Sequence, residues 1–293
     1  MCGIFASELY PAAPSVSEIL QQMKYRGPDE QRVFRAAGFE VGLARLGIVD
    51  TSKPAAVQPQ YSKKGRIVAF NGELYNYHQL CPEARSEVEA LGLMMDYGLD
   101  PRQFLDGDYA IIYYDPSNQT ILLYRDRFGM CPLYFQTNPV VSVSSERRRL
   151  SGKRIWEVPA HGKVSINLKN RAHRTNHLPH YGITCKSGQN ESDVFLNLFL
   201  DAVKSRALHS DTGFSAALSG GLDSSAVVLA CKALELPVCA AITVVSPENS
   251  DDSRFANLIA EYAKLSSHST IIVGMEEMID AAPQILDHLD HPY

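Results

Sequence analysis

The sequence predicts an α+β domain with an antiparallel sheet, followed by an α/β domain with a parallel sheet. In the first half, β-rich runs come in pairs separated by short turns, which is typical of hairpins and therefore of antiparallel pairing. In the second half, continuous apolar strands alternate with helices, a pattern that favours a parallel sheet covered on both faces. A polar stretch containing glycine, CKSGQNES at 185–192, separates the two patterns. We therefore expect one domain over 2–187 and another over 188–293.

The first half is predicted to open with a helix and to continue with hairpins. Ser15 and Glu18 have the spacing of a capping box, and the amphipathic pattern after them predicts a helix to about Tyr25. A second helix is predicted over 82–97. Two pairs of β-rich runs follow, each pair separated by turn-forming residues: AIIYYD (110–115) with TILLYRD (120–126), and PLYFQT (132–137) with VVSVSS (140–145). Both pairs predict antiparallel hairpins.

The second half is predicted to alternate helices with strands. Ser192 is expected to cap the first helix. The elements predicted after it are helix 193–208, strand 214–219, helix 223–236, strand 238–245, helix 251–265, strand 269–274 and helix 275–289. Three parallel strands would leave an edge and uncovered faces, so we expect exposed apolar surface in this half.

The composition fits two globular domains and argues against several classes of function. Of the 293 residues 45% are hydrophobic, which is enough for packed cores. A formal net charge of −5 and the shortness of the arginine run at 147–149 argue against nucleic-acid binding. We find no apolar run long enough to cross a membrane and no signal peptide. The six cysteines show no CxxC spacing, which favours free thiols in a reducing cytoplasm.

The stretch SGGLDSS, from Ser219 to Ser225, joins a predicted strand to a predicted helix. Glycines let the backbone approach an anion closely, and a helix start presents free N–H groups and a positive dipole end. A capped glycine-serine turn would explain SGG alone, but seven matching residues at this junction favour phosphate binding. The stretch resembles the pyrophosphate-binding loop of PP-loop ATP pyrophosphatases, which split ATP into AMP and pyrophosphate. This resemblance implies ATP and Mg²⁺, with Asp223 acting through the Mg²⁺, and no metal site from the protein alone.

The chain begins Met1-Cys2-Gly3-Ile4. Removal of Met1 would leave Cys2 with both a thiol and a free α-amine, and an amine with a pKa near ~8 is a usable base at neutral pH. Cysteine is the most nucleophilic common side chain when a base activates it. Taken alone, this tetrapeptide favours the simpler interpretation, in which Cys2 is an ordinary small residue after the initiator methionine. The remaining motifs decide whether Cys2 is instead a nucleophile activated by its own α-amine.

The start of the chain and five further stretches occur in a fixed order. They are MCGI (1–4), RGPDE (26–30), LARLGIVD (43–50), FNGELYNY (70–77), GDYAIIYYD (107–115) and RDRFGMCPLYF (125–135). Together with SGGLDSS they resemble the asparagine synthetase family, whose first domain is a class II glutamine amidotransferase. The resemblance covers essentially the whole chain. It implies an N-terminal-nucleophile αββα sandwich followed by part of a PP-loop domain of the adenine nucleotide alpha hydrolase-like type.

The resemblance also implies roles for residues of the first domain. Cys2 would attack the carboxamide of glutamine, giving a thioester and ammonia. Asn71 and the backbone N–H of Gly72 would form the oxyanion hole, whose donors are each typically worth about 10²–10³ in rate. Arg45 would hold the glutamine carboxylate with its bidentate fork.

Two acidic residues would bind the ammonium of glutamine. Glu73 is one, and Glu87 stands where the family has Asp, so its carboxylate reaches about 1.5 Å further and glutamine affinity is expected to differ. Each assignment has a simpler alternative: Asn71-Gly72 is a common turn pair, and Arg45 and Glu73 could be surface charges. Arg26 and Asp29 could simply stabilise a loop. The ordered motifs favour catalysis.

In the second domain, the resemblance assigns the ATP site to the phosphate loop and two apolar residues. The residues are Leu218, Ser219, Gly220, Gly221, Asp223, Ser224 and Ile242. Asp251 and Asp252, followed by Ala256, resemble a further family motif, although acidic residues also suit the start of a helix.

The implied function is a glutamine-dependent synthetase. Ammonia released by Cys2 would aminate a carboxylate activated as acyl-AMP, by default aspartate. The sequence given stops at Tyr293, before a second glycine-acid motif of the family, so a second polypeptide or a homodimer is expected to supply what this half lacks. Two alternatives remain open. One is a glutaminase subunit that feeds ammonia to a partner chain, and the other is a catalytically silent scaffold.

Overall fold

The computed structural model describes residues 1–11, 15–51, 54–178, 190–247 and 250–289. The chain forms two compact units, Met1–Gly182 and Ile183–Tyr293. The boundary expected between 187 and 188 lies outside the described residues. None of the helices in the described ranges combines the length and the apolar character needed to cross a membrane.

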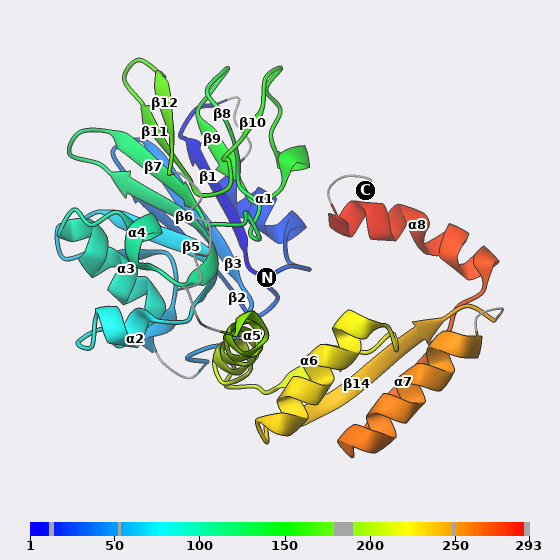
Figure 1. The fold of residues 1–293 in the computed structure, drawn as a ribbon. Helices are drawn as coiled ribbons and strands as arrows, with labels where there is room; N and C mark the ends of the chain where they lie inside the picture. Colours follow the sequence, from blue (N-terminus) through cyan, green and yellow to red (C-terminus); the bar gives the residue numbers. More distant parts are fainter. Residues whose placement is uncertain (12–14, 52–53, 179–189, 248–249, 290–293) are drawn as a thin grey trace. The chain divides into compact units, whose positions relative to one another are not determined.

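The first unit contains two six-stranded antiparallel sheets (Figure 1). The first sheet has the order β10-β8-β9-β1-β3-β2 and contains β1 (Gly3–Glu8), β2 (Glu30–Ala36), β3 (Phe39–Arg45), β8 (Tyr134–Gln136), β9 (Ser142–Ser144) and β10 (Trp156–Glu157). The second has the order β12-β11-β7-β6-β5-β4 and contains β4 (Gln60–Tyr61), β5 (Ile67–Leu74), β6 (Gly107–Asp115), β7 (Thr120–Arg125), β11 (Gly162–Asn167) and β12 (His173–His177). Both predicted hairpins, β6-β7 and β8-β9, are confirmed.

The two sheets enclose the largest core and carry helices on their outer faces. Alternation along each strand explains this: Ile4 and Ala69 point into the core between the sheets, while the neighbouring Phe5 and Phe70 point outward. Helix α1 (Val16–Gln22) covers the outer face of the first sheet, and α3 (Glu87–Asp96) covers that of the second. The remaining short helices are α2 (Tyr77–Leu80), α4 (Pro101–Phe104), η1 (Pro54–Ala56) and η2 (Arg147–Arg149).

Three predictions about helix ends in the first unit are wrong. Helix α1 follows Ser15, but the Ser15 side chain makes no capping hydrogen bond, and the helix ends at Gln22 rather than Tyr25. The helix predicted over 82–97 starts only at Glu87, because Ser86 caps it by accepting a hydrogen bond from the Glu89 N–H at 3.3 Å.

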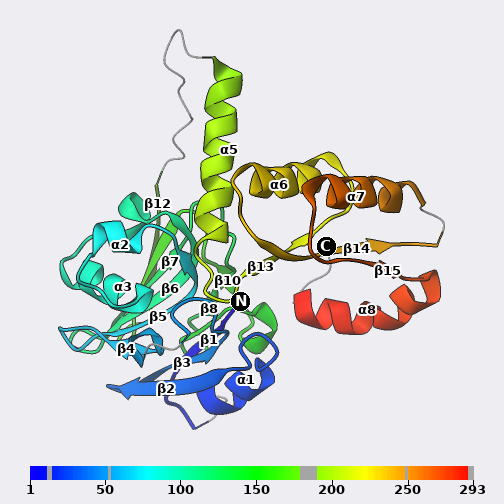
Figure 2. The ribbon, with the colours of Figure 1, turned by 90° about the horizontal axis from the view of Figure 1, so that it is seen from below.

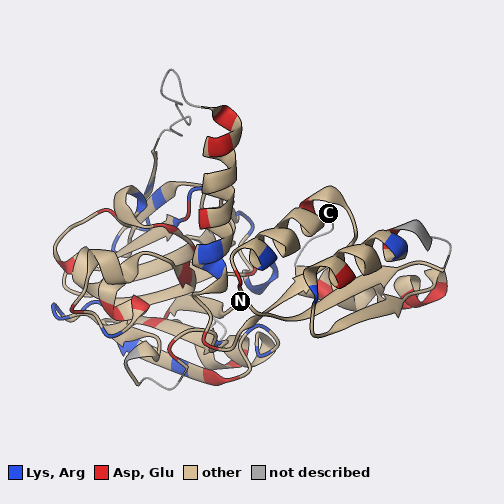
Figure 3. Cartoon of the chain, turned by 60° about the horizontal axis from the view of Figure 1, so that its bottom comes forward, with Lys and Arg blue, Asp and Glu red and all other residues tan. Residues whose placement is uncertain are grey.

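The second unit holds a three-stranded parallel sheet of order β13-β14-β15. Its elements are α5 (Glu191–Ala207), β13 (Phe214–Ala217), α6 (Leu222–Ala233), β14 (Val238–Val245), α7 (Ser250–Ala263), β15 (His268–Ile272) and α8 (Met275–Leu289). Helix α5 is capped by Asn190, not by Ser192 as predicted, since the Asn190 side chain accepts from the Ser192 N–H. Figure 3 shows acidic residues at the start of α5 and basic residues at its end, an order that suits the helix dipole.

Helices cover one face of this parallel sheet. Val228 of α6 and Ala256 and Ala260 of α7 pack against Leu218 and Ala241. Figure 2 shows α6 and α7 on the same side of β14. The other face exposes Ile242 and Val244 of β14 by 43% and 61%, and Ile271 of β15, which pairs with Val244, by 48%. Within the described residues, coverage of both faces is therefore wrong, whereas the expected exposed apolar surface is confirmed.

Candidate functional site

The ends of three strands bring the predicted residues of the first unit together. Strand β1 begins at Gly3, which pairs with Ala44, so Cys2 lies at the sheet edge where β3 ends at Arg45. Strand β5 ends beside them, and α3 begins with Glu87. A cavity at this point is lined by Cys2, Arg45, Leu46, Ile48, Val49, Ala56, Gln58, Phe70, Gly72, Glu73, Ser86, Glu87 and Val88. Residues 85 positions apart in the sequence thus share one site.

Cys2 lies half-buried against the core between the sheets. The Leu46 N–H donates a hydrogen bond to Cys2 Sγ at 3.3 Å. Burial raises the pKa of the Cys2 thiol above its ordinary value, while the Leu46 backbone and the nearby Arg45 charge act to lower it. A thiol with a raised pKa is protonated at neutral pH, so Cys2 needs a base to become a nucleophile.

Arg45 is held by the loop that follows β3. One of its terminal nitrogens, Nη2, donates to the carbonyl oxygens of Val49 at 3.1 Å and Asp50 at 3.3 Å. The loop is fixed in turn by Asp29, which accepts from the Gly47 N–H at 2.7 Å. Guanidinium has five N–H donors, so Arg45 can bind these carbonyls and a carboxylate together. Asp29 therefore stabilises this loop, as the simpler of its two interpretations predicted.

Asn71 and Gly72 lie within β5, opposite Ala110 and Tyr109, and the turn interpretation is therefore wrong. Gly72 has φ +130°, and a Cβ there would lie 1.8 Å from the Asp108 carbonyl oxygen, so only glycine fits. Asn71 does not line the cavity itself. It is fully buried, and its Oδ1 and Nδ2 atoms have no hydrogen-bond partner among the described residues.

An unpaired buried amide costs about 1–3 kcal/mol, so its presence calls for an explanation. Along β5, alternation places Asn71 on the same side as Ala69, which faces the core between the sheets. Cys2 packs against that same core. The structure therefore brings Asn71 and Cys2 to the same core but does not place both in the cavity.

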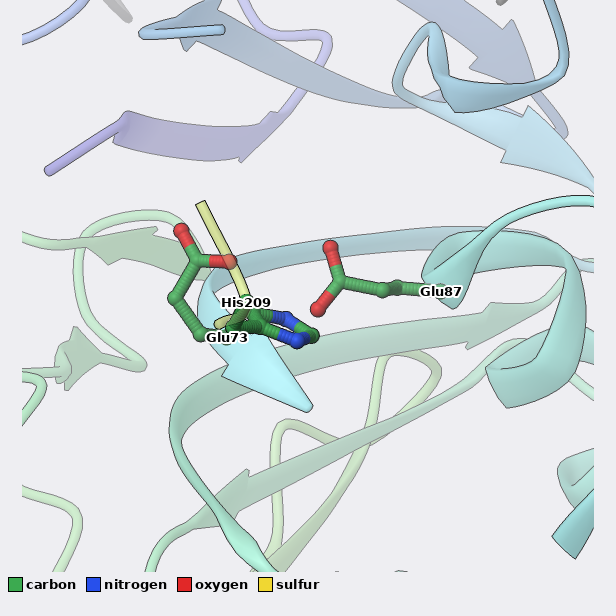
Figure 4. A group of neighbouring side chains, drawn as sticks. All are labelled: Glu73, Glu87 and His209. Atoms are coloured by element: carbon green, nitrogen blue, oxygen red, sulfur yellow. The ribbon is translucent and has the colours of Figure 1, made fainter. Parts of the chain in front are cut away.

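Glu73 and Glu87 bring two carboxylates to one place. A carboxylate oxygen of each lies within 4.8 Å of the other, and Glu87 extends from the start of α3 toward Glu73 (Figure 4). Glu87 accepts a hydrogen bond from the Leu74 N–H at 2.6 Å, which ties α3 to the end of β5. Two nearby carboxylates favour a shared cation, such as an ammonium group. Neither Arg45 nor Glu73 is the freely solvated surface charge that the alternative interpretation required.

Several lining residues were missed by the sequence analysis. Leu46, Ile48 and Val49 belong to the LARLGIVD stretch, whose position next to Arg45 was the available signal. For Gln58 the sequence offers no comparable signal, because its role depends on a contact with a distant segment. Gln58 Oε1 accepts a hydrogen bond from the Phe70 N–H at 2.8 Å. This bond fixes β5 next to Asn71.

In the second unit, the phosphate-loop stretch connects β13 to the first turn of α6, which is the strand-to-helix junction that the sequence predicts. Gly221 precedes α6, and no side chain caps that helix start. The Ser219 and Ser224 hydroxyls lie 3.0 Å apart, and Ser219 Oγ accepts from the Gly221 N–H at 3.3 Å. Asp223 is exposed in the first turn of α6. The loop therefore presents hydroxyls and helix N–H groups at one point, which suits an anion.

Leu218 and Ile242 are neighbours in this unit, since the Leu218 N–H donates to the Ile242 carbonyl at 2.9 Å. A residue that the sequence analysis missed fixes this position: the buried Thr243 hydroxyl donates to the Leu218 carbonyl at 2.6 Å. Gly220 has φ +81°, and a Cβ there would lie 2.6 Å from the carbonyl oxygen of Asp252, an exposed residue of α7. The side chain of Asp251 lies outside the described residues.

Two family models match the chain. Residues 1–184 match the family model described as glutamine amidotransferase domain, and residues 195–293 match the model described as asparagine synthase. The glutamine-hydrolyzing asparagine synthetase of Asparagus officinalis is 29% identical over 316 aligned residues, which cover 99% of this chain and 53% of that protein. Asparagine synthetase B of Escherichia coli K12 is 29% identical over 78% of this chain and 44% of that protein.

The chain spans about half the length of the curated relatives it matches. A solved structure of a glutamine aminotransferase class-II domain protein from Silicibacter pomeroyi covers 60% of this chain and 99% of its own, at 12% identity. Its TM-score of 0.34 is too low to support a conclusion about the fold.

Proposed function

The chain belongs to the glutamine amidotransferase family, and from this membership we propose that it hydrolyses glutamine and delivers the ammonia to an ATP-activated carboxylate, by default aspartate. The observation that carries the proposal is the convergence of Cys2, Arg45, Glu73 and Glu87 on one cavity. The residues complement the ends of glutamine: a cation for its carboxylate, two carboxylates for its ammonium and a thiol for its carboxamide.

The chemistry of the first step follows from the residue types. With Met1 removed, the α-amine of Cys2 takes the proton of the thiol, and the sulfur attacks the carboxamide carbon. The negative charge that develops on the carboxamide oxygen is stabilised by donors from Asn71 and the Gly72 N–H, which at such sites are typically worth about 10²–10³ in rate each. As this intermediate collapses, the α-ammonium returns its proton to the departing nitrogen, which leaves as ammonia. Water then hydrolyses the remaining thioester to glutamate and the free thiol.

We assign the two steps to the two halves of the chain. Residues 2–187 would form the amidotransferase domain with the N-terminal-nucleophile αββα sandwich fold, supported by two stacked sheets with helices on their outer faces. Residues 188–293 would form the first part of the ATP-binding domain of the PP-loop type. The described cysteines form no disulfide, which supports the cytoplasm as the place of action.

The phosphate loop fits ATP by its donor set. Ser219, Gly220, Gly221 and Ser224 would hold the phosphates, and the uncapped start of α6 supplies N–H groups. Leu218 and Ile242 would contact the adenine nucleotide, and Asp223 would share a Mg²⁺ with the phosphates. When bound, ATP supplies the activation of the acceptor carboxylate as acyl-AMP.

The test measures glutamate release from glutamine and AMP formation from ATP with aspartate present, using the full chain. Cys2→Ala should abolish glutamine use and spare any reaction with free ammonia. Glutamate release without AMP formation would restrict the function to a glutaminase that serves another chain. Absence of both activities, or glutamine hydrolysis that survives Cys2→Ala, would refute the proposal.

A further inference from the structure

Glu146 is fully buried two residues after the end of β9, and it does not line the cavity around Cys2 that we assign to glutamine, here called the glutamine cavity. Its carboxylate is within 3.1 Å of Arg148 Nε, 2.9 Å of Arg149 Nε and 3.8 Å of Arg26 Nη1. The Tyr25 hydroxyl donates to it as well. A buried carboxylate is costly unless it is paired, so this arrangement needs a structural reason or a functional one.

The three arginines differ in what else they contact. Arg149 also donates to Gln22, at the end of α1. Arg26 has a side chain only 9% exposed, and its Nε donates to the main-chain carbonyl of Cys2 at 3.0 Å. Among the described residues, Glu146 is the one acidic partner of Arg26. The carboxylate therefore neutralises the cation that contacts the Cys2 main chain.

Cys2 lies outside the strand ladder, so its main-chain carbonyl is held by Arg26 rather than by a neighbouring strand. The pairing of β1 with β3 starts at Gly3, one residue later. The neighbouring Ser145 holds the strand from the same side: its N–H donates to the Ile4 carbonyl at 2.9 Å, and its hydroxyl accepts from the Ile4 N–H at 3.0 Å. The pair Ser145-Glu146 thus fixes the first residues of the chain, directly at Ile4 and through Arg26 at Cys2.

We propose that Glu146 is a positioning residue for glutamine hydrolysis, which holds Arg26 so that its guanidinium fixes the main chain of Cys2 and, with it, the directions of the thiol and the α-amine. The inference rests on the proposed glutaminase function. Misplacement of a reacting group by about 1 Å can cost about 10²-fold in rate. Because neither Glu146 nor Arg26 lines the glutamine cavity, substrate binding is independent of them.

The experiment compares Glu146→Gln with a matched control, Glu8→Gln, in the full chain. Glu8 lies at the other end of β1, where it pairs with Arg171 at 3.2 Å and accepts from the Val141 N–H at 2.7 Å. We expect Glu146→Gln to lower kcat for glutamate release by about 10–100-fold with KM within about 3-fold, and Glu8→Gln to leave both within about 2-fold. Glu146→Asp, which keeps the charge, should recover part of the lost kcat.

A folded Glu146→Gln with unchanged kcat, a loss that appears in KM instead, or an equal loss in Glu8→Gln would overturn the inference. If Glu146→Gln does not fold, Arg26→Lys tests the inference in its place. This variant keeps the positive charge beside Glu146 but loses the Nε donor that binds the Cys2 carbonyl. It should show the same fall in kcat at constant KM, and wild-type kinetics would refute the positioning role.

A wild-type chain that releases no glutamate would refute the proposed function rather than this inference. Alkylation of Cys2 by iodoacetamide, measured at the N-terminal peptide, then tests the positioning directly. Glu146→Gln should change the alkylation rate and Glu8→Gln should not. Equal rates in wild type and both variants would overturn the positioning role.

Discussion

Replacing Asn71 should separate stability from activity. The Asn71 amide is fully buried and has no hydrogen-bond partner among the described residues, so the folded state already bears a desolvation cost of about 1–3 kcal/mol at this position. Asn71→Leu removes both polar atoms and keeps a side chain of similar size, at a packing cost of about 1 kcal/mol. The net expectation is a free energy of unfolding that is unchanged or raised by up to about 2 kcal/mol.

For a unit of this size, 1 kcal/mol corresponds to about 2–4 °C in Tm, so the first unit of Asn71→Leu should melt at the wild-type temperature or a few degrees above it. Glutamate release should nevertheless fall by about 10²–10³, because the oxyanion donor is lost. Thermal unfolding followed by circular dichroism and an enzymatic glutamate assay measure the two quantities on the same preparation.

Gln58→Met is the matched control for Asn71→Leu. Gln58 is also a buried amide, but its Oε1 accepts from the Phe70 N–H at 2.8 Å. Its replacement leaves that N–H buried and unpaired, so Tm should fall by about 2–10 °C. If Asn71→Leu lowers Tm as much as Gln58→Met, the Asn71 amide has a partner in solution, and the reasoning fails. Glutamate release within about 3-fold of wild type would show that Asn71 is not an oxyanion donor.

Three further changes test the local geometry. Gly72→Ala should prevent stable folding of the first unit or lower its Tm by more than 10 °C. The reason is that Gly72 has φ +130° and that a Cβ there would lie 1.8 Å from the Asp108 carbonyl oxygen. A Tm within about 2 °C of wild type would contradict this. Gly220→Ala should weaken binding of a fluorescent ATP analogue at least about 10-fold. Gly220 has φ +81°, and a Cβ there would lie 2.6 Å from the Asp252 carbonyl oxygen, so the loop would have to change its conformation. Unchanged binding would show that the phosphates do not bind at this loop. At Asp96, burial alone would raise the pKa, but donors from the Lys64 N–H, Ser62 and Arg66 hold it below its ordinary value. A carboxyl whose folded-state pKa is lowered stabilises the fold above its unfolded pKa of about 3.9, and this stability is lost as the pH falls through the folded value. Asp96→Asn should therefore unfold about 1–3 kcal/mol more easily than wild type at pH 7 in urea titrations, with the difference shrinking below pH 4; a constant difference would contradict the sign.

The sequence by itself determined the two kinds of sheet and most of their elements. Period-two alternation and paired runs predicted β6-β7 and β8-β9, because hairpin pairing is local and its signals lie within a few residues. Helix starts were less predictable. Ser86 and Asn190 cap α3 and α5, and Ser15 makes no cap at all, since capping depends on a rotamer and a backbone angle that neighbouring residues decide.

Motifs also identified Cys2, Arg45, Gly72, Glu73 and Glu87, which line one cavity in the folded chain. Only the tertiary structure decided how these residues are held. Gln58 fixes β5 through Phe70, and Glu146 reaches Cys2 through Arg26, a contact across 120 positions of sequence. Such contacts leave no periodic trace in the sequence, because they arise from the pairing and stacking of strands that are distant along the chain.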